Sequence, residues 1–216
     1  MANEPQTRER GDGGPAGSPG KAAFDRLTAG LALAFLAPLF GIIAVAIRLE
    51  DSGPVFYRQW RPGLHGRPFR IYKFRTMIPD AERVGTGMKT SRHDPRITRV
   101  GRLLRQTSLD ELPQLINVLQ GDMSVIGPRP GLPAQADRYT PRQRRRLETR
   151  PGITGWAQVT GRNDLTWEER IERDIWYIDN WSLLLDLQIL ARTPWAMINP
   201  RGIYGSGGET RDLGEK

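Results

Sequence analysis

A long run of apolar residues near the N-terminus dominates the hydropathy pattern of the chain. Residues 27–47 carry no charged side chain over 21 positions, which is long enough for a helix to cross a bilayer once. The run is apolar on every face of such a helix, and this disfavours a core helix of a water-soluble domain. A cleaved signal peptide is also disfavoured, because a long polar sequence precedes the run and no clear cleavage site follows it.

Two features favour a helix that enters and leaves the bilayer on the same side. Pro38 lies in the middle of the run, where it removes a backbone donor and bends or breaks a helix. Both flanks of the run are basic, and positive charge tends to stay on the cytoplasmic side of a membrane. We therefore expect a re-entrant membrane helix over residues 21–50, broken at Pro38, with a single span as the alternative.

The remaining sequence predicts two tails and one folded domain. Residues 1–20 are rich in Gly, Pro and charge and almost lack apolar side chains, so they cannot bury enough surface to offset the entropy of ordering. We expect a disordered tail there and a flexible C-terminal tail over residues 206–216. Residues 51–205 form the folded domain.

The first half of this domain predicts a β-hairpin followed by two helices. Residues 54–60 and 67–77 have the composition of strands, and the Pro and Gly residues between them suit a turn. A short basic helix is expected over 100–106, and an apolar one over 108–119 that ends near Gly121.

The second half predicts further helices with aromatic side chains. Thr140 and Pro141 suit the first positions of a helix, residues 151–162 a loop with a short strand, and residues 166–180 and 182–198 two longer helices. The last two helices carry four aromatic residues that suit either a membrane–water boundary or a core: Trp176, Tyr177, Trp181 and Trp195. The expected fold class is a helix-rich α/β fold, a small membrane-associated domain with a re-entrant helix, a short β-hairpin and interfacial amphipathic helices.

The net charge of the chain indicates which classes of molecule it binds. The 216 residues include 32 Lys and Arg against 24 Asp and Glu, a net charge of +8 with a pI near 10.4. This excess favours a polyanion, an anionic membrane or a phosphorylated substrate. The absence of cysteine excludes a disulfide framework, a cysteine-ligated zinc and a thiol nucleophile.

An adjacent acidic pair, Asp110–Glu111, begins the apolar helix of this basic chain and admits two interpretations. Ser108 and Glu111 have the spacing of a capping box. Alternatively, the pair performs chemistry on an anion: arginines precede it, and Arg129 follows the helix between two prolines, which limits its freedom when it grips a phosphate. A carboxylate nucleophile, a carboxylate ligand of Mg²⁺ and arginine clamps together suit phosphoryl-type transfer.

Two other basic clusters are open to more than one interpretation. Lys73 and Arg75 alternate on a predicted strand and share one face, so they line a phosphate pocket or form an ordinary exposed face. Residues 142–146 read RQRRR, which suits a solvated or lipid-facing helix surface better than a nucleic-acid site.

From about Lys21 onward, the chain resembles the bacterial sugar transferase family, in particular its small monotopic phosphoglycosyl transferases. The resemblance rests on five blocks in order: the apolar run with Pro38, KFRTM (73–77), TSLDELPQLINVLQGDMSVIGPRP (107–130), PGITGWAQVTGRN (151–163) and DNWSLLLDLQIL (179–190). One departure is Ala37 before Pro38, where well-known members have serine.

The resemblance implies an enzyme at the cytoplasmic face of the inner membrane, with residues 51–205 as its catalytic domain. It implies transfer of a sugar-1-phosphate from a UDP-sugar to a polyprenyl phosphate such as undecaprenyl phosphate, with release of UMP. The product would begin the assembly of a cell-surface glycan. Nucleic acid is not an expected partner, and the sequence does not specify the oligomeric state, for which a homodimer is one option.

The resemblance also implies roles for particular residues. Asp110 would be the nucleophile that attacks the sugar-linked phosphorus, and Glu111 would hold Mg²⁺ together with Asp110. Arg105 and Arg129 would bind the substrate phosphates. Two further positions match the family less firmly: Arg162 for the nucleotide and Asp186 in a supporting role.

Two other classes of function compete with this one. A membrane-tethered nucleic-acid-binding protein would account for the charge, but not for an acidic pair among arginines or for the paired prolines. A structural scaffold on the membrane surface, without chemistry, would account for the apolar run alone.

Overall fold

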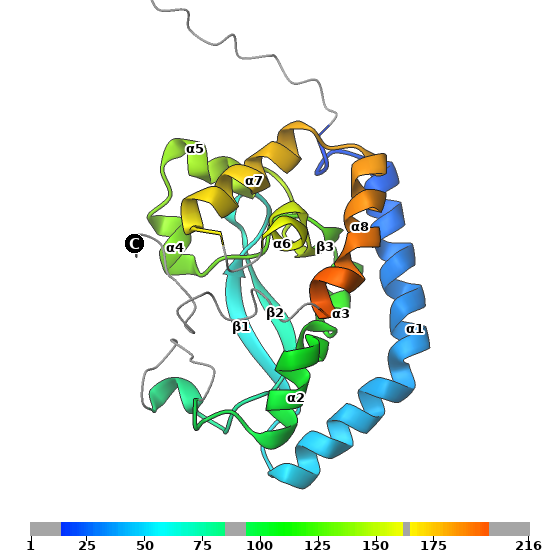
Figure 1. Cartoon of the computed structure of the whole chain (residues 1–216), viewed down its shortest axis with the longest axis vertical. Coiled ribbons are helices and arrows are strands. Elements are labelled where there is room, and N and C mark those ends of the chain that lie inside the picture. Colours follow the sequence, from blue (N-terminus) through cyan, green and yellow to red (C-terminus); the bar gives the residue numbers. More distant parts are fainter. Residues whose placement is uncertain (1–13, 85–93, 162–164, 199–216) are drawn as a thin grey trace, which may run out of the picture.

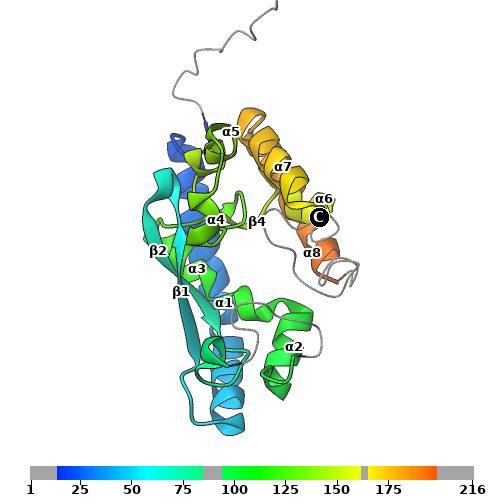
Figure 2. The same ribbon diagram turned by 90° about the vertical axis from the view of Figure 1, so that its left-hand side faces the viewer.

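The fold is a helix-rich α/β arrangement supported by one long helix. The computed structural model describes residues 14–84, 94–161 and 165–198. Figure 1 shows α1 (Pro19–Glu50) along one side of the molecule, and Figure 2 shows α1 and the β1–β2 hairpin on the side opposite α7 (Trp167–Asp179) and α8 (Leu183–Ile198). The shorter helices are α2 (Arg99–Thr107), α3 (Gln114–Gln120), α4 (Pro133–Asp137), α5 (Pro141–Arg144) and α6 (Trp156–Thr160).

The described strands form two small sheets. The predicted hairpin is confirmed: β1 (Phe56–Pro62) pairs antiparallel with β2 (Pro68–Phe74), in a register that sets Phe56 opposite Phe74. Its turn closes with a 2.8 Å hydrogen bond from the Gly63 amide to the Arg67 carbonyl. The second sheet pairs β3 (Ser124–Ile126) in parallel with β4 (Gly152–Thr154).

α1 packs against the rest of the domain along its whole length. Near its start, Ala29 is fully buried in the main core. That core also draws Leu115, Val118, Met123 and Ile189 from α3, the segment after it and α8. Near its end, Ile43 and Ile47 join Phe74 and Leu104 in a separate buried cluster. One face of α1 is therefore covered by the hairpin and by the helices around the acidic pair.

The opposite face of α1 is apolar and exposed. Leu31, Phe35 and Leu49 are 73%, 84% and 82% exposed, although large apolar side chains seldom gather on the surface of a water-soluble monomer. Within the described ranges, α1 alone is long and apolar enough to cross a bilayer. An apolar face of this length indicates membrane association.

The expected break at Pro38 is absent, which corrects the sequence-based prediction. α1 continues as a single helix through Pro38, whose side chain is exposed. Figure 1 shows that the two ends of α1 run in different directions, so the helix bends without interruption. α1 also begins at Pro19, earlier than expected, because the Ser18 hydroxyl accepts a hydrogen bond from the Lys21 amide at 3.3 Å.

The apolar helix expected over residues 108–119 is divided. A single 3₁₀ turn, η3 (Leu109–Glu111), precedes Pro113, and α3 then runs to Gly121, which caps it with a positive φ of 84°. Ser108 has a φ of 57° and ends α2 instead of capping a helix through its side chain. The acidic pair consequently lies on a turn between two helices.

The C-terminal predictions are largely confirmed. Thr140 caps α5 and Thr166 caps α7, each with a capping box, whereas α6 was not expected within residues 151–162. The aromatic residues divide between the two expected environments, because Tyr177 is buried in the core while Trp176 and Trp195 are 44% and 73% exposed. The two predicted tails, 1–20 and 206–216, lie mostly or wholly outside the described residues.

We expect Asn117 to be important for folding because its side chain joins α3 to β2. The amide of this fully buried residue donates to the Arg70 carbonyl at 2.8 Å and accepts from the Tyr72 amide at 3.0 Å. Asn117→Ala would leave both backbone groups without a partner and lower the free energy of unfolding by about 2–4 kcal/mol. Guanidinium unfolding in detergent measures this loss. Gln120→Ala, an exposed position in the same helix, is the control, and an equal loss there would contradict the prediction.

Candidate active site

The acidic pair lies where three parts of the fold meet. η3 follows α2 through the left-handed turn at Ser108 and precedes α3. β2 lies on one side, and the loop around Pro128 and Pro130 contributes Arg129. Asp110 and Glu111 are both half-buried, so their carboxylates are reachable from solvent.

Glu111 is held by two cations from distant parts of the chain. Lys73 of β2 donates to its Oε1 at 2.8 Å, and Arg129 donates Nη1 to Oε2 at 2.7 Å and Nη2 to Oε1. Burial acts to raise the pKa of Glu111, but the charges of Arg129 and Lys73 outweigh it and hold the pKa well below its ordinary value. Glu111 is therefore ionised, and its carboxylate accepts hydrogen bonds from the side chains of Lys73 and Arg129. The backbone amide of Ser108, which a capping box would place on Glu111, donates instead to the Arg105 carbonyl. The capping-box interpretation is wrong.

Asp110 lies in the same positive surroundings but is left unbonded. Within the described part of the chain, no group donates a hydrogen bond to its carboxylate. Burial, and then the neighbouring charge of Glu111, raise the pKa of Asp110 to about 6, against the opposing charges of Lys73, Arg105 and Arg129. The charges of Lys73, Arg105 and Arg129 do not outweigh burial and the charge of Glu111, but this pKa lies below 7, so the carboxylate form predominates at neutral pH. An ionised, unbonded carboxylate is free to attack an electrophile.

Arg105 reaches the site because α2 packs tightly against the chain that leaves β2. Its Nε donates to the Thr76 hydroxyl at 2.8 Å. A Cβ at Gly101, one turn earlier, would lie 2.0 Å from the Thr76 carbonyl oxygen, so only glycine permits this approach. Among the described residues, the two Nη groups of Arg105 have no hydrogen-bond partner, and the charge of Arg105 acts on Asp110.

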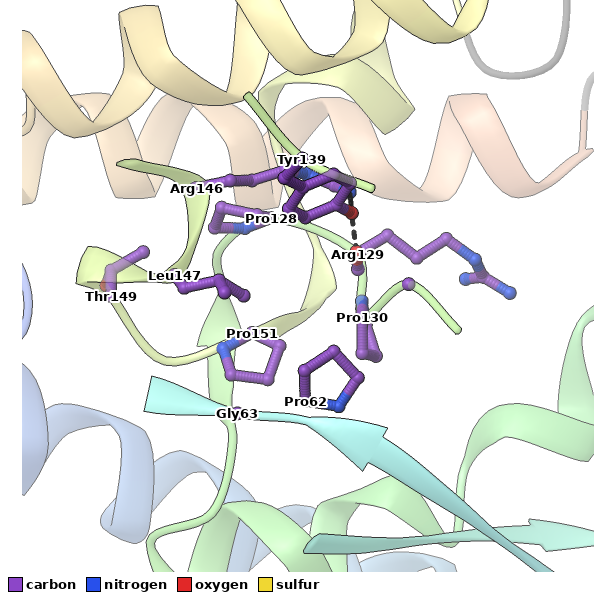
Figure 3. A pocket seen from close by; sticks show the side chains of 11 residues that line it. Pro62, Gly63, Pro128, Arg129, Pro130, Tyr139, Arg146, Leu147, Thr149 and Pro151 are labelled. Carbon is purple, nitrogen blue, oxygen red and sulfur yellow. Dashed lines mark hydrogen bonds between the residues drawn. The ribbon is translucent and has the colours of Figure 1, made fainter. Parts of the chain in front are cut away.

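Arg129 extends from a loop stiffened by a proline on each side. Its side chain is 41% exposed, and Figure 3 shows it extending away from the prolines and from Tyr139. The charge of Glu111 raises the pKa of Arg129 further above its ordinary value. The structure therefore brings together five predicted residues: Lys73, Arg105, Asp110, Glu111 and Arg129.

Arg75 has a different position from the one predicted. Its guanidinium is buried and donates to Asp51 at 2.7 Å and to the Pro54 carbonyl at 2.5 Å. These contacts fasten the connection between α1 and β1. The guanidinium is not free for a phosphate, because Arg75 turns to this connection and not to the face that carries Lys73.

Asp186 is buried away from solvent and supports the fold. Its carboxylate accepts hydrogen bonds from Lys21 and Tyr177 at 2.8 Å and from Trp181 at 3.1 Å. These bonds connect the first turn of α1 to α7 and α8, and none comes from a residue around Asp110. Arg162 lies outside the described residues.

The sequence interpretation missed Arg61, whose charge reaches the site from β1. Burial, and then the charge of Arg129, lower the pKa of Arg61 to about 10, while Glu111 acts to raise it. Its Nε is buried, and no described residue accepts a hydrogen bond from it. Strand alternation supplied a signal, because Tyr57, Gln59 and Arg61 share one face, and all three are half-buried.

The basic run 142–146 is solvated in part, as expected, because Arg142 and Arg144 are exposed, whereas Arg146 is buried. Three of its arginines form ion pairs with acids of α7: Arg142 with Glu172, Arg145 with Asp179 and Arg146 with Asp174. The run therefore joins α5 and the 3₁₀ turn η4 (Arg145–Glu148) to α7.

Sequence comparison identifies the class of protein to which this site belongs. The family model of the bacterial sugar transferases matches residues 17–200, which include the whole site and nearly all of the described chain. The chain belongs to this family and is a phosphoglycosyl transferase.

Three relatives illustrate the family. The chain is 48% identical over 184 residues to the uncharacterized sugar transferase EpsL of Bacillus subtilis, covering 85% of this chain and 89% of EpsL. It is 40% identical over 204 residues to the exopolysaccharide production protein ExoY of Rhizobium meliloti, covering 88% and 90% of the two chains. It is 45% identical over 197 residues to a UDP-glucose:undecaprenyl-phosphate glucose-1-phosphate transferase of Caulobacter vibrioides, covering 85% and 72%.

We predict that Asp110 titrates near pH 6 and that Glu111→Gln lowers this midpoint. Removing the Glu111 charge ends its repulsion of the Asp110 carboxylate and frees Lys73 and Arg129 to stabilise that carboxylate. Carbon NMR of aspartate carboxyl groups, with Asp110→Asn for assignment, measures both midpoints. Asp94 is the internal reference, because its bond to Arg96 lowers its pKa. A higher midpoint for Asp110 in Glu111→Gln would contradict the prediction.

Proposed function

We propose that this protein transfers a sugar-1-phosphate from a UDP-sugar to undecaprenyl phosphate or a similar polyprenyl phosphate, and releases UMP. The relative from C. vibrioides is named for this reaction with UDP-glucose. The observation that carries the proposal is the unbonded carboxylate of Asp110 beside a Glu111 that Lys73 and Arg129 neutralise. We further propose that the product begins the assembly of a cell-surface glycan.

The proposed reaction has two steps with Asp110 as the nucleophile. A carboxylate oxygen of Asp110 attacks the phosphorus that carries the sugar, and the bond from that phosphorus to the bridging oxygen breaks. UMP leaves with the electron pair, and the sugar phosphate remains on Asp110 as an acyl phosphate. An oxygen of the polyprenyl phosphate then attacks the same phosphorus, which forms the polyprenyl diphosphate sugar and returns Asp110 as a carboxylate.

The surrounding cations have the charge that this reaction needs. Negative charge develops on the phosphoryl oxygens and on the departing UMP, and fixed guanidinium and ammonium groups stabilise it. Arg105 and Arg129 are proposed to contact the substrate phosphates, with Lys73 and Arg61 adding positive charge from the hairpin. Because Arg129 and Lys73 already surround Glu111, a phosphate that enters the site meets donors already in place.

The acidic pair also fits a bound Mg²⁺. Two neighbouring carboxylates are the hard oxygen ligands that Mg²⁺ takes together with substrate phosphates, and Asp110 accepts no hydrogen bond from the described residues. Glu111, and Asp110 before it reacts, are proposed to hold the ion. When bound, Mg²⁺ would neutralise phosphate charge and favour departure of UMP. Lys73 and Arg129 would then share Glu111 with the ion.

We propose that α1 is re-entrant and holds the catalytic domain on the cytoplasmic face of the inner membrane. A helix of 32 residues is about 48 Å long, well over the thickness of the hydrocarbon core. Both of its ends contact the same domain, through the Lys21–Asp186 pair and through Ile43 and Ile47. A helix that spanned the bilayer would draw this polar domain into hydrocarbon, whereas a bent helix lying shallowly exposes only its apolar face.

Asp110→Asn is expected to reduce UMP release at least about a thousandfold, because an amide cannot act as the attacking carboxylate. The assay supplies a panel of UDP-sugars with undecaprenyl phosphate, and unchanged unfolding confirms that the variant is folded. Without acceptor, sugar label should remain on wild-type protein and be absent from the variant. Asp137→Asn, at an exposed position, is the matched control. UMP release within tenfold of wild type by folded Asp110→Asn would rule out this nucleophile.

Topology is testable because the chain has no cysteine. Ser18→Cys and Ser52→Cys place one thiol just outside each end of α1. We expect an impermeant maleimide to label both positions in inverted vesicles and neither in right-side-out vesicles, since both ends face the cytoplasm. Lysis with detergent, after which both must react, controls for accessibility. Labelling of a different single position in each preparation would show that α1 crosses the membrane.

A further inference from the structure

Arg146 differs from the other arginines of its basic run in being deeply buried. Its side chain is 3% exposed and that of its partner Asp174 is 1% exposed, whereas the neighbouring Arg142–Glu172 pair is 65% and 51% exposed. Burying a charged pair removes both ions from water, so it seldom adds stability over an apolar pair of similar size. The burial of this pair is therefore better explained by the geometry it imposes than by stability.

The guanidinium of Arg146 is bonded on three sides. Its Nη2 donates to the backbone carbonyl of Arg129 at 2.7 Å, its Nη1 to the Tyr139 hydroxyl at 2.8 Å, and its Nε to Asp174 at 2.6 Å. The group also lies over the Trp167 ring, 5.2 Å from the centroid. Arg146 therefore connects α7 and the chain after α4 to the backbone of the loop that carries Arg129.

The two guanidinium groups lie on opposite sides of this loop. Figure 3 shows Arg146 and Tyr139 together on one side of it, and the Arg129 side chain extending to the other. On that other side Arg129 donates two hydrogen bonds to Glu111. Prolines on both sides of Arg129 restrict the loop, and the bond to its carbonyl removes a further freedom, the rotation of that peptide plane.

We infer that Arg146 is a positioning residue, which holds the backbone of Arg129 so that the Arg129 guanidinium meets Glu111 and the substrate phosphates. Asp174 is its counter-ion and Tyr139 orients it. The inference rests on the proposed function for the part that concerns phosphates. Small displacements of a group that stabilises charge are costly in rate, so this buried pair acts on catalysis without touching the substrate.

The test compares how strongly loss of the Arg146–Asp174 pair slows UMP release when Arg129 is present and when it is absent. Arg146→Met with Asp174→Leu replaces the pair by apolar side chains of similar size, which a fold tolerates better than one unpaired charge. We expect kcat/KM for UMP release to fall about thirtyfold, mostly through kcat, when Arg129 is present. In an Arg129→Ala background the same double change is expected to alter the rate less than about twofold, because residues acting as a unit are not additive. Equal losses in both backgrounds would overturn the inference.

A matched pair and a milder variant serve as controls. Arg142→Gln with Glu172→Gln removes the exposed ion pair between the same two segments and is expected to change the rate less than about twofold in both backgrounds. A thirtyfold loss there would show that any link to α7 suffices, against a role specific to Arg146. Tyr139→Phe removes one bond to Arg146 and leaves the buried pair intact, so it tests the inference even if the double variant does not fold. We expect about a threefold loss that disappears in Arg129→Ala, and persistence of that loss would count against the inference.

A second measurement separates this inference from the proposed function. If the wild-type protein releases UMP from none of the UDP-sugars, the proposed function is wrong. The effect of Arg146 on the position of the Arg129 guanidinium can still be measured by NMR without substrate. The Arg129 Nε–H signal, assigned by its loss in Arg129→Lys, is expected to shift or broaden in the Arg146–Asp174 double variant and to stay in place in the Arg142–Glu172 variant. An unmoved signal in both would overturn the inference.

Discussion

The shared carboxylate of Glu111 is the interaction on which the site depends. It gathers Lys73 from the hairpin and Arg129 from the proline loop, two cations that would otherwise repel each other. Two cations around one carboxylate leave a net positive charge beside Asp110, and neither cation forms a hydrogen bond to Asp110. The two adjacent carboxylates therefore differ in role: Glu111 binds the cations, and Asp110 is left without a hydrogen bond from the described residues.

α1 packs against the elements that bring Lys73 and the acidic pair together. The same helix face supports β2 through Phe74, α2 through Leu104 and α3 through Leu115 and Val118. These are the elements that supply or flank the acidic pair, so the position of the site depends on how they pack against α1.

Several basic side chains form ion pairs inside the fold. Lys21 pairs with Asp186, Arg75 with Asp51 and Arg146 with Asp174, and each pair joins segments far apart in the sequence. Buried ion pairs add little net stability, but their geometry is specific. These pairs therefore determine where elements meet more than how firmly the chain folds.

The sequence by itself determined the features that depend on neighbours within a few residues. The apolar run of α1, the hairpin, and the helix starts at Thr140 and Thr166 follow from local pattern, and the Asp110–Glu111 pair among arginines marked the site. Only the tertiary structure decided what each charge faces. Glu111 looked like a helix cap, but its partners lie 38 and 18 residues away. Arg75, which was expected in the site, fastens the connection between α1 and β1, whereas Arg61, which was not expected there, adds its charge to the site. The physical reason is the same: strand alternation defines which residues share a face, whereas the packing of distant elements defines what that face meets.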